Sequence, residues 1–189
     1  MELNTNELKS FLEEKVQQYN TLAFIKDDPI AIPHSFSKKE DIEIAAFFSA
    51  TIAWGNRKSI MTSARSLMKR MDNAPHDFIL NHTADDLGVF DGFVHRTFQQ
   101  EDLIFFVTRL QKLYKQFGGL ETLFTPKTEA VNMHAVLFKF HELFFAVPHP
   151  KRTTKHVANP AKKSAAKRLH ICLLYTSPIP RDQRGSGMP

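Results

Sequence analysis

The chain has 189 residues, of which 42% are hydrophobic and 17 are Phe, a composition that suits one domain with a phenylalanine-rich core. No stretch reaches about 18 consecutive apolar residues and the N-terminus lacks a signal-peptide pattern, so we expect no membrane span and a cytoplasmic location. The single Cys172 excludes an internal disulfide and a cysteine-rich metal site. Residues 1–142 carry 16 Lys and Arg against 19 Asp and Glu, whereas residues 143–189 carry 9 against 1. The basic C-terminal part either attracts nucleic acid or anionic lipid, or is a solvated loop.

The first predicted helix covers residues 5–19. Its apolar side chains recur every three or four positions and form one stripe: Leu8, Phe11, Leu12 and Val16. Pro29 and Pro33 then interrupt any helix, so residues 26–36 are predicted to be a loop.

The next predicted helix, residues 37–54, is apolar on nearly every face. Ser37 followed three residues later by Glu40 is the signature of a capping box at its start. The polar residues after Ile42 are few: Glu43, Ser49 and Thr51. A helix that is apolar all round lies inside a domain, so we expect this one at the centre of the core, with Glu43 paired to an arginine.

Gly55 is suited to end that helix, and Asn56 to cap the next one over residues 57–71. The buried face of this third helix is predicted to be Ile60, Met61, Ala64, Leu67, Met68 and Met71. Further helices are predicted over residues 75–80, 101–117, 120–124 and 129–147, with an irregular segment at 83–93. Since no strand longer than four residues is indicated, residues 1–150 form an all-α domain, an irregular orthogonal helical bundle.

The C-terminal segments differ from this domain. Residues 151–170 are predicted to be a basic loop followed by the start of a further helix from Pro160. Residues 171–189 lose the helical pattern and resemble a translated sequencing-adapter junction, which recurs at the ends of unrelated metagenomic predictions. We therefore expect 171–189 to be a non-native or disordered tail outside the fold, and the natural sequence to continue past His170.

The turn between the second and third helices is the predicted binding site. Free backbone N–H groups after Asn56 suit a phosphate, Arg57 and Lys58 add positive charge, and Trp54 offers a stacking surface for a base. The alternative is structural, with Trp54 covering the core and the two cations lying on an ordinary surface. The predicted nucleic-acid-binding residues are Trp54, Gly55, Asn56, Arg57 and Lys58, with phosphate contacts from Lys151, Arg152, Lys155, Lys162, Lys163, Lys167 and Arg168.

Other chemistry finds little support in the sequence. His141-Glu142 begins like a zinc-protease helix, but Phe145 stands where the second histidine is required. His134 could share a helix face with His141, but no third ligand is evident. We expect no metal, no cofactor and no catalytic residue in this chain.

Several strings carry a family resemblance. Pro33-His34-Ser35-Phe36, residues 41–50, Ala53-Trp54-Gly55-Asn56-Arg57 and Lys167-Arg168-Leu169 resemble an uncharacterised bacterial family of unknown function, common in Bacteroides-like bacteria and spirochaetes. The resemblance covers about residues 1–170. In that family Asn and a further helical region follow Lys-Arg-Leu, whereas His170 follows here, which favours a truncated chain.

A second resemblance is more remote. Residues 43–56 are similar to the first core helix of helix-hairpin-helix DNA glycosylases, whose pattern E-x-x-A-x-x-x-S is matched by Glu43 and Ala46, with the serine displaced to Ser49. This resemblance implies a truncated helix-hairpin-helix glycosylase-like domain from an enzyme that flips a damaged base and cleaves its glycosidic bond. In that superfamily the hairpin and the catalytic Asp or Lys lie in the C-terminal half, and nothing before residue 170 matches them.

Two functions follow as expectations. The first is that the chain is the N-terminal fragment of a DNA-glycosylase-like protein that binds DNA, the fragment itself being catalytically inactive. The alternative is a non-enzymatic helical protein-interaction module that docks a partner through exposed Phe faces around Phe105, Phe138 and Phe145.

Overall fold

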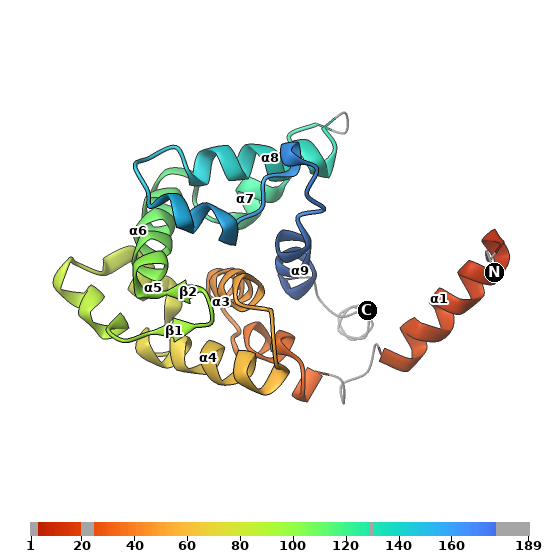
Figure 1. Cartoon of the computed structure of the whole chain (residues 1–189), viewed down its shortest axis with the longest axis horizontal. Helices are drawn as coiled ribbons and strands as arrows, with labels where there is room; N and C mark the ends of the chain where they lie inside the picture. Colours follow the sequence, from red (N-terminus) through yellow and green to blue (C-terminus); the bar gives the residue numbers. More distant parts are fainter. Residues whose placement is uncertain (1–3, 20–24, 129–130, 177–189) are drawn as a thin grey trace, which may run out of the picture.

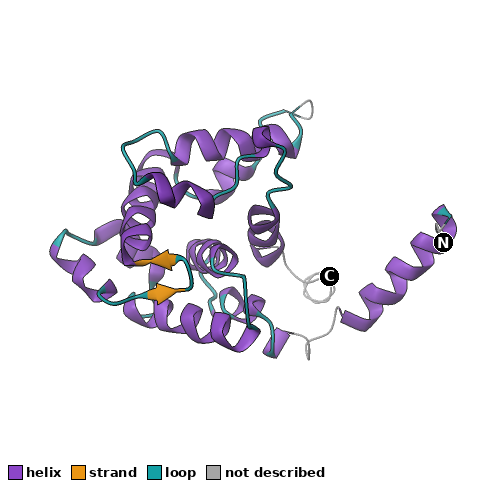
Figure 2. Ribbon diagram, viewed as in Figure 1, coloured by secondary structure: helices purple, strands orange, loops and turns teal. Residues whose placement is uncertain are grey.

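The computed structural model describes residues 4–19, 25–128 and 131–176, and these residues are mostly helical (Figure 1; Figure 2). The α-helices are α1 (Thr5–Tyr19), α3 (Lys39–Thr51), α4 (Arg57–Arg70), α5 (Pro75–Asn81), α6 (Gln100–Phe117), α7 (Leu120–Phe124), α8 (Met133–Phe144) and α9 (Lys167–Thr176). The 3-10 helices are η1 (Pro29–Ala31), η2 (Pro33–Ser35), η3 (Asp85–Phe90), η4 (Lys151–His156) and η5 (Pro160–Lys162). Strands β1 (Val94–His95) and β2 (Phe98–Gln99) pair as a small antiparallel hairpin. The all-α prediction is confirmed.

Helix α3 is the centre of the fold, as its all-round apolar sequence predicted. Every residue from Glu43 to Thr51 is buried. Helices α4, α5, α7 and α9 pack against it, together with η1 and η2. Figure 1 shows α3, in orange, lying between α4 and α9.

The ends of α3 differ from the prediction. The helix begins at Lys39 with Lys38 as its N-cap, so Ser37 lies one position too early for a capping box. It ends at Thr51, three residues before Trp54. Asp41, in its first turn, accepts a hydrogen bond of 2.8 Å from the backbone N–H of His76 and so caps the start of α5.

Helices α4 and α6 follow their predicted bounds closely. The Asn56 side chain caps α4 by accepting from the N–H of Ser59, and the predicted apolar positions of this helix are buried. Helix α6 ends at Gly118, whose φ of +83° is the left-handed conformation expected of a glycine C-cap.

Phenylalanine rings fill the space between α3, α6 and α8. Phe47 packs on Phe106 with ring centroids 5.6 Å apart, Phe106 on Phe144 at 4.8 Å, and Phe140 on Phe144 at 5.5 Å. These offset and edge-on contacts add to the free energy gained by burying the rings. The phenylalanine-rich core is thus confirmed, and it fixes three helices relative to one another.

Two segments before residue 150 have structure that the sequence did not indicate. The predicted irregular region contains the 3-10 helix η3, and the hairpin of β1 and β2 follows it directly.

Helix α8 begins at Met133, where the Asn132 side chain caps it, and ends at Phe144, so it is shorter than the predicted 129–147. Residues 129 and 130 lie outside the described residues.

The C-terminal segments are folded onto the domain more fully than predicted. Residues 151–156 form η4, with Thr153 and His156 buried, rather than an open basic loop. Helix α9 extends to Thr176 and buries Leu169, Cys172 and Tyr175, packing along α3. The expectation that the fold ends before residue 171 is therefore wrong for residues 171–176; residues 177–189 lie outside the described residues.

Candidate nucleic-acid interface

The turn from α3 to α4 is built around Gly55. Its φ of +106° is left-handed, and a Cβ atom at this position would lie 2.8 Å from Nη1 of Arg96. Glycine therefore allows both the turn and the close approach of Arg96, which stands at the tip of the β1–β2 hairpin. The exposed Arg96 guanidinium is thereby placed beside the N-terminal end of α4.

Helix α4 presents a continuous basic face. Its 14 residues include five Lys and Arg and no Asp or Glu. Lys58, Thr62, Arg65 and Lys69 are spaced by three or four residues and all are exposed, so they lie on one side of the helix. Among the described residues, no carboxylate forms an ion pair with Arg57, Lys58, Arg65 or Lys69. We call Lys58, Thr62, Arg65 and Lys69 the α4 stripe.

A surface hollow of about 480 Å³ lies at the N-terminal end of this stripe. Its lining joins the start of α4 to the segment before η1: Lys26, Asp27, Asn56, Arg57, Lys58, Met61, Thr62 and Arg65. Four cations and one carboxylate thus surround the hollow, which leaves it with a positive charge. The first turn of α4 adds the positive end of the helix dipole.

Trp54, predicted as a stacking surface for a base, is half-buried in a cluster of protein side chains. The His156 ring stacks on it at 5.6 Å with an interplanar angle of 10°, and the His95 ring meets it edge-on at 5.9 Å. The Arg168 guanidinium lies 4.3 Å from the centroid of the indole. These contacts match the structural alternative for Trp54, since its ring is engaged by protein groups.

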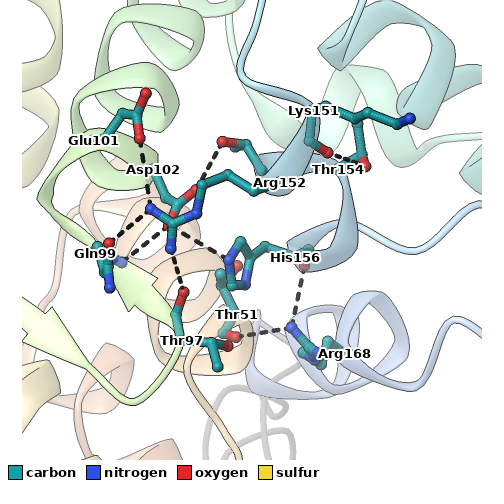
Figure 3. Close-up of polar contacts among 11 residues, drawn as sticks. Thr51, Thr97, Gln99, Glu101, Asp102, Lys151, Arg152, Thr154, His156 and Arg168 are labelled. Atoms are coloured by element: carbon teal, nitrogen blue, oxygen red, sulfur yellow. Dashed lines mark hydrogen bonds and ion pairs between the residues drawn. The ribbon is translucent and has the colours of Figure 1, made fainter.

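A buried carboxylate, Asp102 in the first turn of α6, organises the other side of this cluster (Figure 3). Its Oδ1 accepts from the Thr153 hydroxyl at 2.7 Å, and its Oδ2 accepts from the Gln99 N–H at 3.0 Å. The Arg152 guanidinium lies 3.2 Å from the same Oδ2 and also donates to the carbonyl of Thr97. Asp102 thereby fastens η4 to the hairpin and to the start of α6.

His156 is buried between Asp102 and Trp54 as a neutral ring. Its Nε2 lies 3.5 Å from the Asp102 carboxylate, and neither ring nitrogen forms a hydrogen bond within the described part of the chain. Burial lowers the pKa of His156 to about 4, although the Asp102 charge acts in the opposite direction. At neutral pH the uncharged His156 ring therefore stacks on the indole of Trp54.

The C-terminal cations that were predicted to contact phosphate fall into two groups. Arg152 binds Asp102, and Arg168 donates to the carbonyls of Thr51 and His156, so both arginines hold the protein together (Figure 3). The five lysines are exposed: Lys151, Lys155, Lys162, Lys163 and Lys167. The predicted set of seven is therefore not one surface cluster.

Several residues of the interface were missed by sequence reasoning. Lys26 and Arg96 come from other segments, and only the fold places them beside α4. Arg65 and Lys69 lie outside the predicted buried face of α4, and sequence reasoning did not join them to the site. The absence of any acidic residue in α4 was the available signal for them.

The metal-ligating residue types do not gather at one place within the described residues. Among them, no three His, Cys, Asp or Glu side chains are grouped so as to hold a metal ion. His141 is buried, and its Nδ1 lies 3.1 Å from the carbonyl oxygen of Val157. No helix within this part of the chain is long and apolar enough to cross a membrane.

Comparison with known proteins gives one relationship. Residues 28–175 match the model of a family described as "Protein of unknown function (DUF2400)". No curated protein and no solved structure matches the chain.

Proposed function

The chain belongs to the DUF2400 family of proteins of unknown function, and from the charge of its own surface we propose that it binds the phosphate backbone of DNA. The contact surface is the α4 stripe with the hollow at its N-terminal end. The observation that carries this proposal is the run of cations on α4 that have no acidic partner within the described part of the chain. Unpaired surface cations in a row are the electrostatic footprint of a nucleic-acid-binding protein.

The length of the stripe supports a backbone contact. From Lys58 to Lys69 the helix rises about 16 Å, at roughly 1.5 Å per residue. A duplex carries one charge per about 1.7 Å of its axis, so several phosphates lie within reach of these side chains. Ser59, exposed on α4, adds a hydroxyl donor of the kind that binds phosphate oxygens, whereas the Thr62 hydroxyl donates to the carbonyl of Lys58 at 2.9 Å.

The absence of aromatic residues from α4 favours duplex over single-stranded DNA. Proteins that bind single strands stack bases on exposed aromatic rings, but α4 contains none. The nearest candidate, Trp54, is packed against His156 and Arg168. We therefore propose binding that depends on charge and duplex geometry rather than on base identity.

We also propose that the chain is related to helix-hairpin-helix DNA glycosylases. The all-α fold and the similarity of residues 43–56 to the first core helix of those enzymes support this relationship. In this proposal the present chain supplies DNA contacts and carries no catalytic residue of its own.

Fluorescence anisotropy with a labelled duplex of about 20 base pairs tests DNA binding. We expect the triple substitution Lys58→Ala, Arg65→Ala, Lys69→Ala to weaken binding at least tenfold at about 50 mM salt, and to make the salt dependence shallower by about three counterions. The matched control removes the same charge from exposed lysines on α6 and α8: Lys112, Lys115 and Lys139. Absence of binding by the unmodified chain at low salt, or equal weakening by the control, would contradict the proposal.

A second function, docking of a protein partner, is favoured by helix α1. Its apolar stripe is largely exposed, from 45% for Leu8 to 58% for Val16. Of the Phe residues predicted to form a docking face, Phe138 is 37% exposed, whereas Phe105 and Phe145 stack on each other at 5.8 Å and are only partly exposed. If a partner binds, we propose that α1 is the element it contacts.

A further inference from the structure

A pocket of about 400 Å³ lies between α3, α7 and α9, and the proposed DNA contact does not use it. Apolar side chains from three helices form much of its wall: Ile42, Leu120, Phe124, Cys172 and Leu173. Polar residues line the rest: Ser37, Lys39, Glu43, Glu121, Thr125 and Thr176. Its size and mixed lining are those of sites that bind small molecules.

One lining residue, Glu43, is a buried carboxylate on the central helix, only 4% exposed. Its Oε2 accepts hydrogen bonds of 2.8 Å from the Tyr114 hydroxyl and from the N–H of Leu120. Its Oε1 accepts one longer bond, 3.3 Å, from the N–H of Glu121. The arginine partner predicted from the sequence is absent, because neutral donors surround this carboxylate within the described residues.

Among the described residues, no cation forms an ion pair with Glu43, and Lys39 acts on it only through the longer-range attraction of their charges. Lys39, the cation in the pocket lining, pairs with Glu121. Burial raises the pKa of the Cys172 thiol, and the charge of Glu43 raises it further, so this charge is felt inside the pocket wall. A buried carboxylate is stabilised when a cation with hydrogen-bond donors reaches it.

We propose that this pocket binds a small organic cation, a protonated amine carried on a compact apolar group. The ammonium donates to Oε1 of Glu43, which has an acceptor position to spare beyond its one long hydrogen bond. The apolar group contacts Ile42, Leu120 and Phe124. Charge complementarity selects an amine over a neutral molecule of the same shape.

Benzylamine and its uncharged counterpart benzyl alcohol are the probes, used with the full chain at pH 7. Titration calorimetry, or the shift of protein NMR signals, is expected to show saturable binding of benzylamine at least about tenfold tighter than that of benzyl alcohol. Glu43→Gln can keep one oxygen as the acceptor for Leu120 and Tyr114, but it removes the charge and the acceptor for the N–H of Glu121, so the preference for the amine is expected to disappear.

A second variant keeps the test decisive if Glu43→Gln does not fold. Thr125→Trp places a large ring at the exposed edge of the pocket and leaves Glu43 untouched, so benzylamine binding is expected to fall at least tenfold. Its matched control is Thr154→Trp, because Thr154 also bonds a nearby carbonyl through its hydroxyl but lies in η4. Equal affinity for the two probes, or benzylamine binding unaffected by Thr125→Trp, would overturn the proposal.

Discussion

Gly55 shows how much of the candidate interface depends on a single backbone position. The left-handed φ of +106° is costly for any residue with a Cβ atom, and that atom would also displace Arg96. One missing side chain therefore permits both the turn into α4 and the position of the neighbouring cation.

We predict that Gly55→Ala lowers the free energy of unfolding by about 1–2 kcal/mol, because alanine is strained at this φ. Chemical denaturation measures the change. The matched control is Gly88→Ala, since no atom lies within 4 Å of a Cβ at Gly88, and a change within about 0.5 kcal/mol is expected there. Equal effects at the two glycines would show that the conformation of Gly55 is not the cause.

Asp102 gives a second prediction at this scale. Asp102→Asn retains the shape of the side chain but removes the charge that faces Arg152 and one acceptor for Thr153 or Gln99. Because the carboxylate is fully buried, we expect a loss of about 2–4 kcal/mol in the free energy of unfolding.

The adjacent Glu101 is the control for Asp102. It pairs with the same arginine at 3.5 Å, but its side chain is exposed, so Glu101→Gln is expected to cost less than about 0.5 kcal/mol. A similar loss in the free energy of unfolding for both substitutions would mean that the burial of Asp102 does not determine how much its contacts stabilise the fold.

At the scale of elements, apolar substitutions are expected to change the free energy of unfolding little in α1 and strongly in the core helices. Phe11 and Leu12 of α1 are about half exposed, whereas Phe140 of α8 is buried. The double substitution Phe11→Ser, Leu12→Gln is therefore expected to leave the free energy of unfolding within about 0.5 kcal/mol, but Phe140→Ala is expected to cost about 3–5 kcal/mol.

The same α1 variant tests whether this helix mediates association. Exposed apolar stripes promote binding to partners or to other copies, so we expect less self-association in sedimentation experiments. A large loss of stability would instead show that α1 packs against the domain in solution.

Elements with a strong local signal were predictable from the sequence. The burial of α3, the Asn56 cap of α4 and the glycine end of α6 each depend on residues within one helix. The buried positions of η4 were not predictable, because its partner Asp102 is 51 residues away and the segment itself reads as a basic loop. The packing of Trp54 was not predictable for the same reason, since His156 and Arg168 reach it from distant parts of the chain.

At the scale of the whole molecule, buried histidines link stability to pH. Burial lowers the pKa of His95 and of His141, and it lowers that of His156 to about 4. In the unfolded chain these rings take up protons near pH 6.5, so between about pH 6.5 and 4 the unfolded state binds more protons. The free energy of unfolding is therefore expected to fall as the pH drops through this window, and to be highest above it.

Denaturation at a series of pH values measures this decline. Each such histidine contributes up to about 1.4 kcal/mol per pH unit. His156→Phe is expected to flatten the decline between pH 6.5 and 4, whereas the exposed His170 replaced by Phe is expected to leave its slope unchanged. A stability that stays constant from pH 7 to 5 would mean that these rings are protonated in the folded protein.

The packing of α9 on α3 also has a consequence for how the chain is made. Arg168 reaches the carbonyl of Thr51 across 117 positions, and Tyr175 reaches Asp28 across 147. A ribosome adding roughly 5–20 residues per second needs about 6–25 s to proceed from the end of α3 to the end of α9. During that time the apolar face of α3 that packs against α9 in the folded protein is still exposed. We therefore expect the nascent chain to bind chaperones that hold apolar segments.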